Sequence, residues 1–154
     1  MADDELCTIR IVGLPLRLHA TSSEHSDELM REFTYLRAQA TDPEGEDVPA
    51  RLLALVDELQ QRFGGFSSAP SAAIDEAIAA GEETLDVEYV VPRSVGAACL
   101  ELDALLDEAD RFCAEGTYLL TLVTPPEAIA YRKWFLSEFV RQSDGEPPSP
   151  WPGR

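Results

Sequence analysis

The sequence predicts an α+β fold in which a small mixed sheet of three to four strands is covered by helices. Polar and apolar residues alternate near the N-terminus and again at 85–91, which is the period of a half-buried strand. Most of the remaining chain carries apolar residues at spacings of three and four, the period of an amphipathic helix. An α/β three-layer arrangement is the alternative. At 154 residues the chain fits one compact domain, placed at 1–142, followed by a Pro-rich tail at 143–154.

Residues 7–20 are expected to be extended. Polar and apolar residues alternate in Thr8–Ile11 and again in Leu16–His19, on either side of Gly13 and Pro15. The two runs are either a hairpin or one strand kinked at Pro15. Because proline has no backbone N–H to donate to a neighbouring strand, an edge position is expected.

Three helices are predicted between the two strand regions. The first follows possible N-caps at 21–23, and a polar loop at 41–47 separates it from the second. The second has Pro49 in its first turn and ends at Gly64, and the third covers 71–80. The apolar face of the first helix is Leu29, Phe33, Leu36 and Ala40, and that of the second is Leu52, Val56, Leu59 and Phe63.

The clearest strand is Leu85–Val91, in which the odd-numbered residues share one face. The longest helix begins at Arg93 or Ser94 and ends at Gly116. A short apolar run at 118–123 is predicted to be a buried strand. A right-handed crossover would place this strand parallel to Leu85–Val91, which is why a mixed sheet is expected.

The C-terminal helix carries the most specific pattern. Thr124 at the N-cap, Pro125 at N1 and Glu127 at N3 form a capping-box sequence. The helix continues to Gln142 and is apolar on more than one side, so it is either sandwiched in the core or partly offered to a partner. The Pro-rich tail either folds back to bury its tryptophan or forms a mobile interaction motif. The candidate partner-binding residues are Tyr131, Trp134, Phe135, Phe139 and Trp151.

The net charge of −17 limits the classes of partner. The negative electrostatic field of such a charge repels nucleic-acid phosphates and anionic lipid, so we expect no nucleic-acid or membrane binding. The same field attracts a protein with a basic patch. No apolar run approaches the length of a membrane span, and Met1–Glu5 lacks the basic residues of a signal peptide. A cytoplasmic location is therefore expected. The net charge does not decide whether the protein forms a homo-oligomer, which stays an alternative.

The sequence lacks the motifs of several common enzyme classes. It contains no GxGxxG, GxxxxGK or GxSxG pattern, and its three cysteines include no CxxC pair. We therefore assign no catalytic, cofactor-binding or metal-ligating residue, and expect no cofactor and a non-enzymatic role. His19 and His25, with Glu24, Asp27 and Glu28, are nonetheless of metal-ligand type. A small metal- or ligand-binding enzyme with a pocket near His19 and His25 is the alternative function.

Four segments, 24–33, 118–127, 132–142 and 147–153, carry a resemblance. They resemble small uncharacterised actinobacterial proteins associated with partner-switching regulation, among anti-sigma factors and their STAS-type antagonists. The resemblance implies a regulatory protein that acts by protein–protein interaction, with a sigma-factor partner switch among its possible settings. The chain departs from the two well-defined classes of such systems, because it has no Asn for a kinase's Mg²⁺ site and no recognisable STAS phosphoacceptor segment. Its single Lys against eleven Arg also suggests a high-GC bacterial coding sequence.

Overall fold

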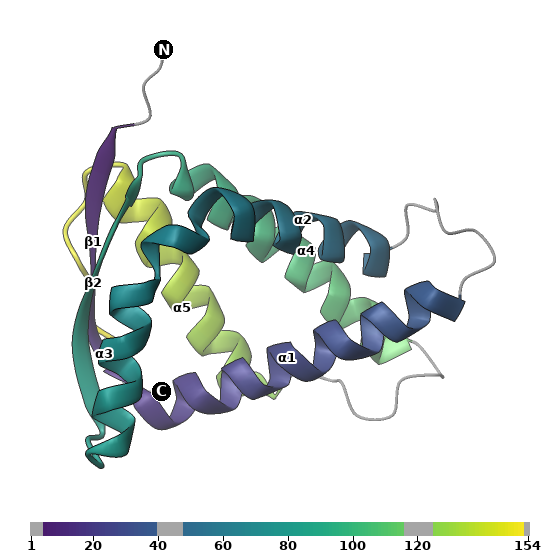
Figure 1. Ribbon diagram of the computed structural model, residues 1–154, viewed down its shortest axis with the longest axis horizontal. Coiled ribbons are helices and arrows are strands. Elements are labelled where there is room, and N and C mark those ends of the chain that lie inside the picture. The colour runs from purple at the N-terminus through teal and green to yellow at the C-terminus, as the bar shows by residue number, and fades with distance from the viewer. Residues whose placement is uncertain (1–4, 40–47, 116–124, 153–154) are drawn as a thin grey trace.

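The computed structural model describes residues 5–39, 48–115 and 125–152. Within these ranges a two-stranded antiparallel sheet lies at one end of the molecule, and the helices extend from it (Figure 1). The α+β prediction is thus confirmed. The elements are β1 (Leu6–Pro15), α1 (Leu16–Gln39), α2 (Val48–Phe63), the 3₁₀ turn η1 (Gly64–Phe66), α3 (Ser68–Ala79), β2 (Thr84–Pro92), α4 (Val95–Glu115) and α5 (Pro126–Ser143).

The predicted strand number was wrong. In the described part of the chain the sheet has two strands instead of three to four, and it is antiparallel and not mixed. The run Leu16–His19 forms the first turn of α1, not a strand. Its alternation is equally compatible with a helix start, because Leu16 is buried there and Arg17 is exposed. The predicted loop at 41–47 and the predicted strand at 118–123 lie outside the described residues.

A β-bulge in β1 changes which of its residues face the core. Val12 and Gly13 together lie opposite Asp86, whereas the rest of the ladder pairs one residue with one. Gly13 has a φ of 70°, which a residue without Cβ adopts at no steric cost, and its N–H donates to Oδ1 of Asp86 (2.8 Å). The bulge moves the inward positions from odd to even numbers. The buried residues of this stretch are accordingly Ile9, Ile11, Leu14 and Leu16.

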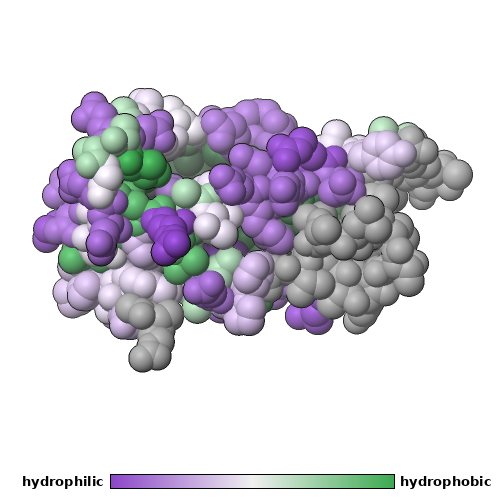
Figure 2. All heavy atoms as spheres, turned by 90° about the horizontal axis from the view of Figure 1, so that it is seen from below, coloured by the Kyte–Doolittle hydropathy of each residue, from purple (hydrophilic) through white to green (hydrophobic). Residues whose placement is uncertain are grey.

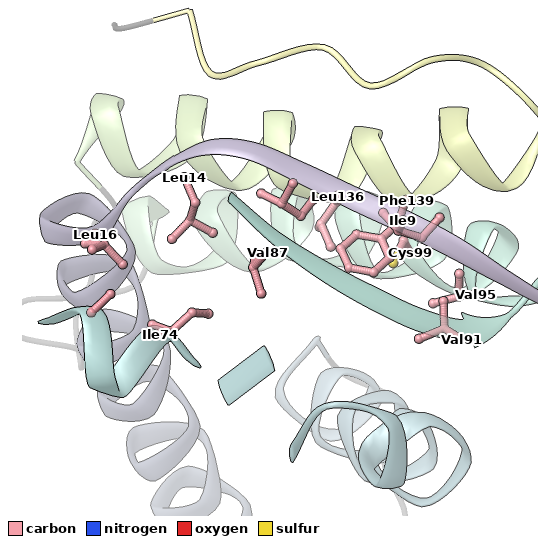
Figure 3. Packing of buried hydrophobic residues seen from close by; sticks show 12 residues of the cluster. Ile9, Leu14, Leu16, Ile74, Val87, Val91, Val95, Cys99, Leu136 and Phe139 are labelled. Atoms are coloured by element: carbon pink, nitrogen blue, oxygen red, sulfur yellow. The ribbon is translucent and has the colours of Figure 1, made fainter. Parts of the chain in front are cut away.

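Two clusters of buried side chains hold the elements together. The larger cluster joins the inner face of the sheet to α3, α4 and α5 (Figure 3), and the smaller one joins α1, α2 and α4. The larger cluster contains Ile9, Ile11, Leu14, Leu16, Ile74, Ala77, Val87, Val91, Val95, Cys99, Leu136 and Phe139. The smaller cluster contains Leu29, Phe33, Leu52, Leu55, Leu105 and Ala109.

The helices between the strands follow the predicted apolar periods. Leu29 and Phe33 are buried in α1, and Leu52 is buried in α2. α2 ends at Phe63, directly before the predicted glycine stop, and Gly81 follows α3 with a φ of 78°. None of the helices in the described part of the chain combines the length and the apolar character needed to cross a lipid bilayer.

The predicted capping box of α5 is wrong. The N-cap is Pro125, one residue later than expected, and no side-chain hydrogen bond caps the helix. A residue that precedes proline is disfavoured in the helical region, so Pro125 is extended (φ −60°, ψ 146°) and the helix starts at Pro126. The Pro125 carbonyl accepts hydrogen bonds from the N–H groups of Ala128 and Ile129 (3.0 and 3.1 Å). Thr124 lies outside the described residues.

Candidate functional site

The five aromatic residues predicted to bind a partner lie in one aromatic cluster formed by α5 and the tail. Tyr131 and Phe139 are buried, with 4% and 5% of their surface exposed, whereas Trp134, Phe135 and Trp151 are partly buried. The Trp151 ring meets the Trp134 ring at a centroid distance of 5.4 Å and the Tyr131 ring at 6.0 Å, both edge to face. Much of the aromatic surface is therefore used within the protein itself.

The tail folds back onto α5 and β1, which is one of the two predicted alternatives (Figure 1). The indole N–H of Trp134 donates to the carbonyl of Ser149 (2.9 Å), and the N–H of Ser149 donates to the buried carboxylate of Glu138 (2.8 Å). Further along, the N–H of Trp151 donates to the carbonyl of Val12 (3.2 Å). These bonds hold the tail beside the outer edge of β1.

The side chain of Gln142 covers the same edge. The Arg10 N–H donates to Oε1 of Gln142, and Nε2 of Gln142 donates to the Arg10 carbonyl, both at 2.8 Å. The Gln142 amide thus pairs with β1 as the peptide group of a neighbouring strand would. Nε2 of Gln142 also donates to Glu138 (2.9 Å), which fixes the amide in place. α5 and the tail thus cover the outer edge of β1 at Arg10 and Val12. Covering an edge strand in this way is a protection that native sheets often need.

The edge of β2 is open. Arg10 and Glu88 are opposite each other, and because the backbone groups of Arg10 point away from β2, those of Glu88 point away from β1. The same holds for Asp86 and Val90. Within the described residues, no hydrogen bond engages the outward backbone groups of these three β2 residues.

Exposed apolar side chains accompany this open edge. Val90 is 48% exposed, and Leu6, at the same end of the sheet, is 56% exposed. Figure 2 shows hydrophobic residues gathered at the end of the molecule that carries the sheet, while hydrophilic residues cover most of the other described surface of that face. The sheet end is therefore the part of the described surface where unpaired backbone and apolar side chains coincide.

A second feature is a hollow of about 250 Å³ between α1, α4 and α5. His19 lines it and lies 2.6 Å from the Tyr131 hydroxyl through Nδ1, an interaction that joins α1 to α5. Its α1 side is polar, with His19, Ser22, Ser23, Ser26 and Asp27. Its opposite side is apolar, with Leu102 and Leu106 from α4 and Phe135 and Leu136 from α5.

Comparisons with protein-family models, with curated proteins and with solved structures find no match. The hollow lies near His19, where the alternative function places a pocket, and His25 is not among the residues that line it. Among the described residues, no group of three His, Cys, Asp or Glu side chains is placed to hold a metal ion. Burial raises the pKa of the Cys99 thiol to about 12, which leaves it protonated in the core.

An ionic ladder joins α4 to α5 and was not predicted from the sequence. Arg132 donates to Asp107 (2.7 Å) and Asp110 (2.9 Å), and Lys133 donates to Asp107 (2.8 Å) and Asp103 (3.2 Å). The signal was present: the three aspartates recur at spacings of four and three, which puts them on one side of the helix. Gln142 and Glu138 were also missed, because their roles depend on β1 and the tail.

We expect His19 to make stability pH-dependent. Burial lowers the pKa of His19, and the charge of Asp75 opposes this in part, so the folded ring favours the neutral form. The unfolded ring protonates near pH 6.5. The unfolded state then binds more protons, so the free energy of unfolding falls as the pH is lowered from about 6.5 towards the folded pKa.

An NMR titration of the His19 ring tests this, with urea unfolding at several pH values beside it. His19→Gln should flatten the slope of stability against pH in that range. Asp75→Asn should lower the pKa of His19 further, because it removes a nearby negative charge. A His19 ring that titrates at or above pH 6.5 in the folded protein would contradict the expectation.

Proposed function

We propose that this protein is a non-enzymatic regulatory protein of the cytoplasm that acts by binding another protein. The observation that carries the proposal is the open edge of β2, with its outward backbone groups unpaired within the described residues. An extended segment of the partner adds to β2 as a third strand, so that main-chain hydrogen bonds provide affinity. The outer edge of β1 is covered at Arg10 and Val12, which favours pairing at β2.

The partner segment is rich in Lys or Arg. Asp86 and Glu88 lie on the open strand, Glu82 and Glu83 precede it, and all four are exposed. The net charge of −17 steers basic partners towards the protein and disfavours acidic ones. A second copy of this chain fits less well, because antiparallel pairing of two β2 edges centred on Glu88 or on Val87 would bring acidic residues opposite acidic residues.

The aromatic cluster supports docking at the sheet rather than on α5. Tyr131 and Phe139 are buried, and Trp151 covers Trp134. Trp134 and Tyr131 contact the tail, which in turn covers β1 at Val12. The resemblance to partner-switching proteins makes an anti-sigma factor or a STAS-type antagonist the first partner to test.

Glu88→Pro should weaken binding of an extended basic peptide at least tenfold. The Glu88 N–H points away from β1, so proline removes a donor from the open edge and leaves the ladder with β1 intact. A short peptide of alternating Lys and Thr is a suitable probe. Binding is measured by fluorescence anisotropy, and hydrogen exchange reports protection at the Asp86, Glu88 and Val90 amides.

Glu88→Thr is the matched control, because it removes the same carboxylate and keeps the N–H. The Thr variant should bind the peptide more tightly than the Pro variant does. Glu101→Lys, an exposed charge reversal on α4, controls for net charge. Thermal unfolding of each variant shows whether the fold is retained. Equal binding by the Pro and Thr variants, with no protection of the β2 amides, would rule out the edge as the docking site.

A further inference from the structure

We propose that the hollow between α1, α4 and α5 binds a small organic cation, a primary amine carried on an aromatic or branched aliphatic body. The hollow and the open edge of β2 are formed by different residues. The proposal therefore does not depend on strand addition at β2. It adds a binding site for a small molecule to a protein whose proposed activity is to bind another protein.

The apolar side of the hollow fits the body of such a ligand. Leu102 and Leu106 from α4 and Phe135 and Leu136 from α5 form this side. Burial of an apolar group against them is favourable in proportion to the area removed from water. The volume of about 250 Å³ is below the range of roughly 300–1,000 Å³ typical of drug-sized ligands. A single ring or a short branched chain is therefore the appropriate size.

The polar side of the hollow fits an ammonium group. Ser22, Ser23 and Ser26 project from α1 with hydroxyl oxygens that accept hydrogen bonds, and Asp27 adds a carboxylate. A primary ammonium has three N–H donors, which this set of acceptors can satisfy. The ligand thus lies with its apolar body on α4 and α5 and its charged end towards α1.

The charges around the hollow disfavour an anion. Arg132 lines the hollow, and its two terminal nitrogens donate to Asp107 and Asp110. Its Nε has no hydrogen-bond partner in the described residues, but the Asp103 carboxylate lies 3.8 Å from it and balances its charge. Lys133 is bound by the same aspartates. Asp27 is on the wall, and Asp75 is close enough to act on His19, whose ring favours the neutral form. Carboxylates therefore outnumber cations, and the uncommitted charge on the wall is negative.

Isothermal titration calorimetry with three isosteric probes tests the proposal: 2-phenylethylamine, 2-phenylethanol and phenylacetate. We expect 2-phenylethylamine to bind with a Kd of roughly 0.1–1 mM, which is reasonable for so small a ligand. Phenylacetate should bind at least about tenfold more weakly, because Asp27 repels its carboxylate. Failure of the amine to bind, or equal binding of the amine and the carboxylate, would overturn the proposal.

Three variants locate the binding. Asp27→Asn should weaken binding of 2-phenylethylamine about five- to tenfold and leave binding of 2-phenylethanol unchanged. Glu24→Gln, which removes an exposed carboxylate of the same helix outside the hollow, should change neither. Ser22→Phe should fill the space and abolish binding of both, with circular dichroism confirming that the helices remain. If Glu24→Gln weakens the amine as much as Asp27→Asn, the ligand responds to the general acidic field and the site is wrong.

Discussion

Glu138→Leu should lower the free energy of unfolding by about 3–5 kcal/mol and release the C-terminal tail. Glu138 is 1% exposed and accepts hydrogen bonds from Arg141 (2.6 Å), Gln142 (2.9 Å) and the backbone N–H of Ser149 (2.8 Å). Leucine has a similar volume but accepts none of them. The substitution therefore removes one acceptor from three donors at once, on α5 and on the tail. Gln142 keeps its bond to Arg10, and Arg141 keeps its bond to Pro147, so the Ser149 N–H is the donor that loses its hydrogen-bond partner.

Two measurements separate tail release from general destabilisation. The backbone N–H of Trp151, which donates to the Val12 carbonyl, should exchange faster with solvent. Tryptophan fluorescence should shift to the red as the Trp134 and Trp151 rings become more exposed to water. Both changes should appear at urea concentrations below the midpoint of global unfolding. If the tail amides keep their protection in the Leu variant, Glu138 does not hold the tail.

Glu146→Leu is the control, because Glu146 also pairs with Arg141 but is exposed. Its carboxylate lies 3.5 Å from Nε of Arg141, and 57% of its side chain is accessible to solvent. An exposed pair of this kind contributes at most about 1 kcal/mol. The loss of unfolding free energy for Glu138→Gln should lie between those of Glu138→Leu and Glu146→Leu. The glutamine amide oxygen still accepts a hydrogen bond, but the side chain no longer carries the carboxylate charge.

The sequence was sufficient for the local part of this fold. The helices were predicted because each repeats its apolar residues over several turns, and Leu85–Val91 was predicted because its alternation ends at a proline. The start of α1 was misread, because four alternating residues fit either a strand or one helical turn. The N-cap of α5 was misplaced by one residue, because the effect of Pro126 on Pro125 outweighed the capping box.

The candidate sites depend on contacts that no local pattern contains. His19 meets Tyr131 across 112 residues of sequence, and Gln142 meets Arg10 across 132. The aromatic residues of α5 were identified as conspicuous, but their burial is decided by the tail, which the sequence left with two alternatives. The open edge of β2 follows from the sheet having two strands in the described residues, and that was the part of the fold predicted incorrectly.

Arg132→Met should lower the free energy of unfolding by about 2–4 kcal/mol at neutral pH. The Arg132 side chain is 13% exposed and makes charge-assisted hydrogen bonds to Asp107 and Asp110. Such bonds are stronger than hydrogen bonds between neutral groups. Its removal leaves three carboxylates of α4 facing one another with Lys133 as their counter-charge. The effect stays below that of a fully buried pair for two reasons. The aspartates are 20–37% exposed, and Nε of Arg132 is buried without a hydrogen-bond partner in the described residues.

The pH dependence of this loss distinguishes electrostatics from packing. Partial burial acts to raise the pKa of Asp107, but the Lys133 hydrogen bond and the Lys133 and Arg132 charges together lower it. A lowered carboxyl pKa stabilises the folded state above the unfolded pKa near 4, and this stabilisation is lost as the pH falls through the folded value. In Arg132→Met the pKa of Asp107 should rise towards its ordinary value near 4. The difference in the free energy of unfolding between the wild type and the variant should therefore narrow as the pH falls below about 4, towards the folded pKa of the wild type.

Urea unfolding of both proteins from pH 7.5 to well below pH 4 measures that difference, because the change is expected between the unfolded pKa near 4 and the lower folded pKa. Arg10→Met provides the matched control, because the Arg10–Glu88 pair (3.5 Å) is more than half exposed on both sides and contributes little. A gap that stays constant with pH would mean that methionine disturbs the packing of α5 on α4 and that the ladder contributes no net charge stabilisation. A narrowing gap would instead assign to Arg132 the role of holding α4 against α5, and with it one wall of the hollow that faces α1.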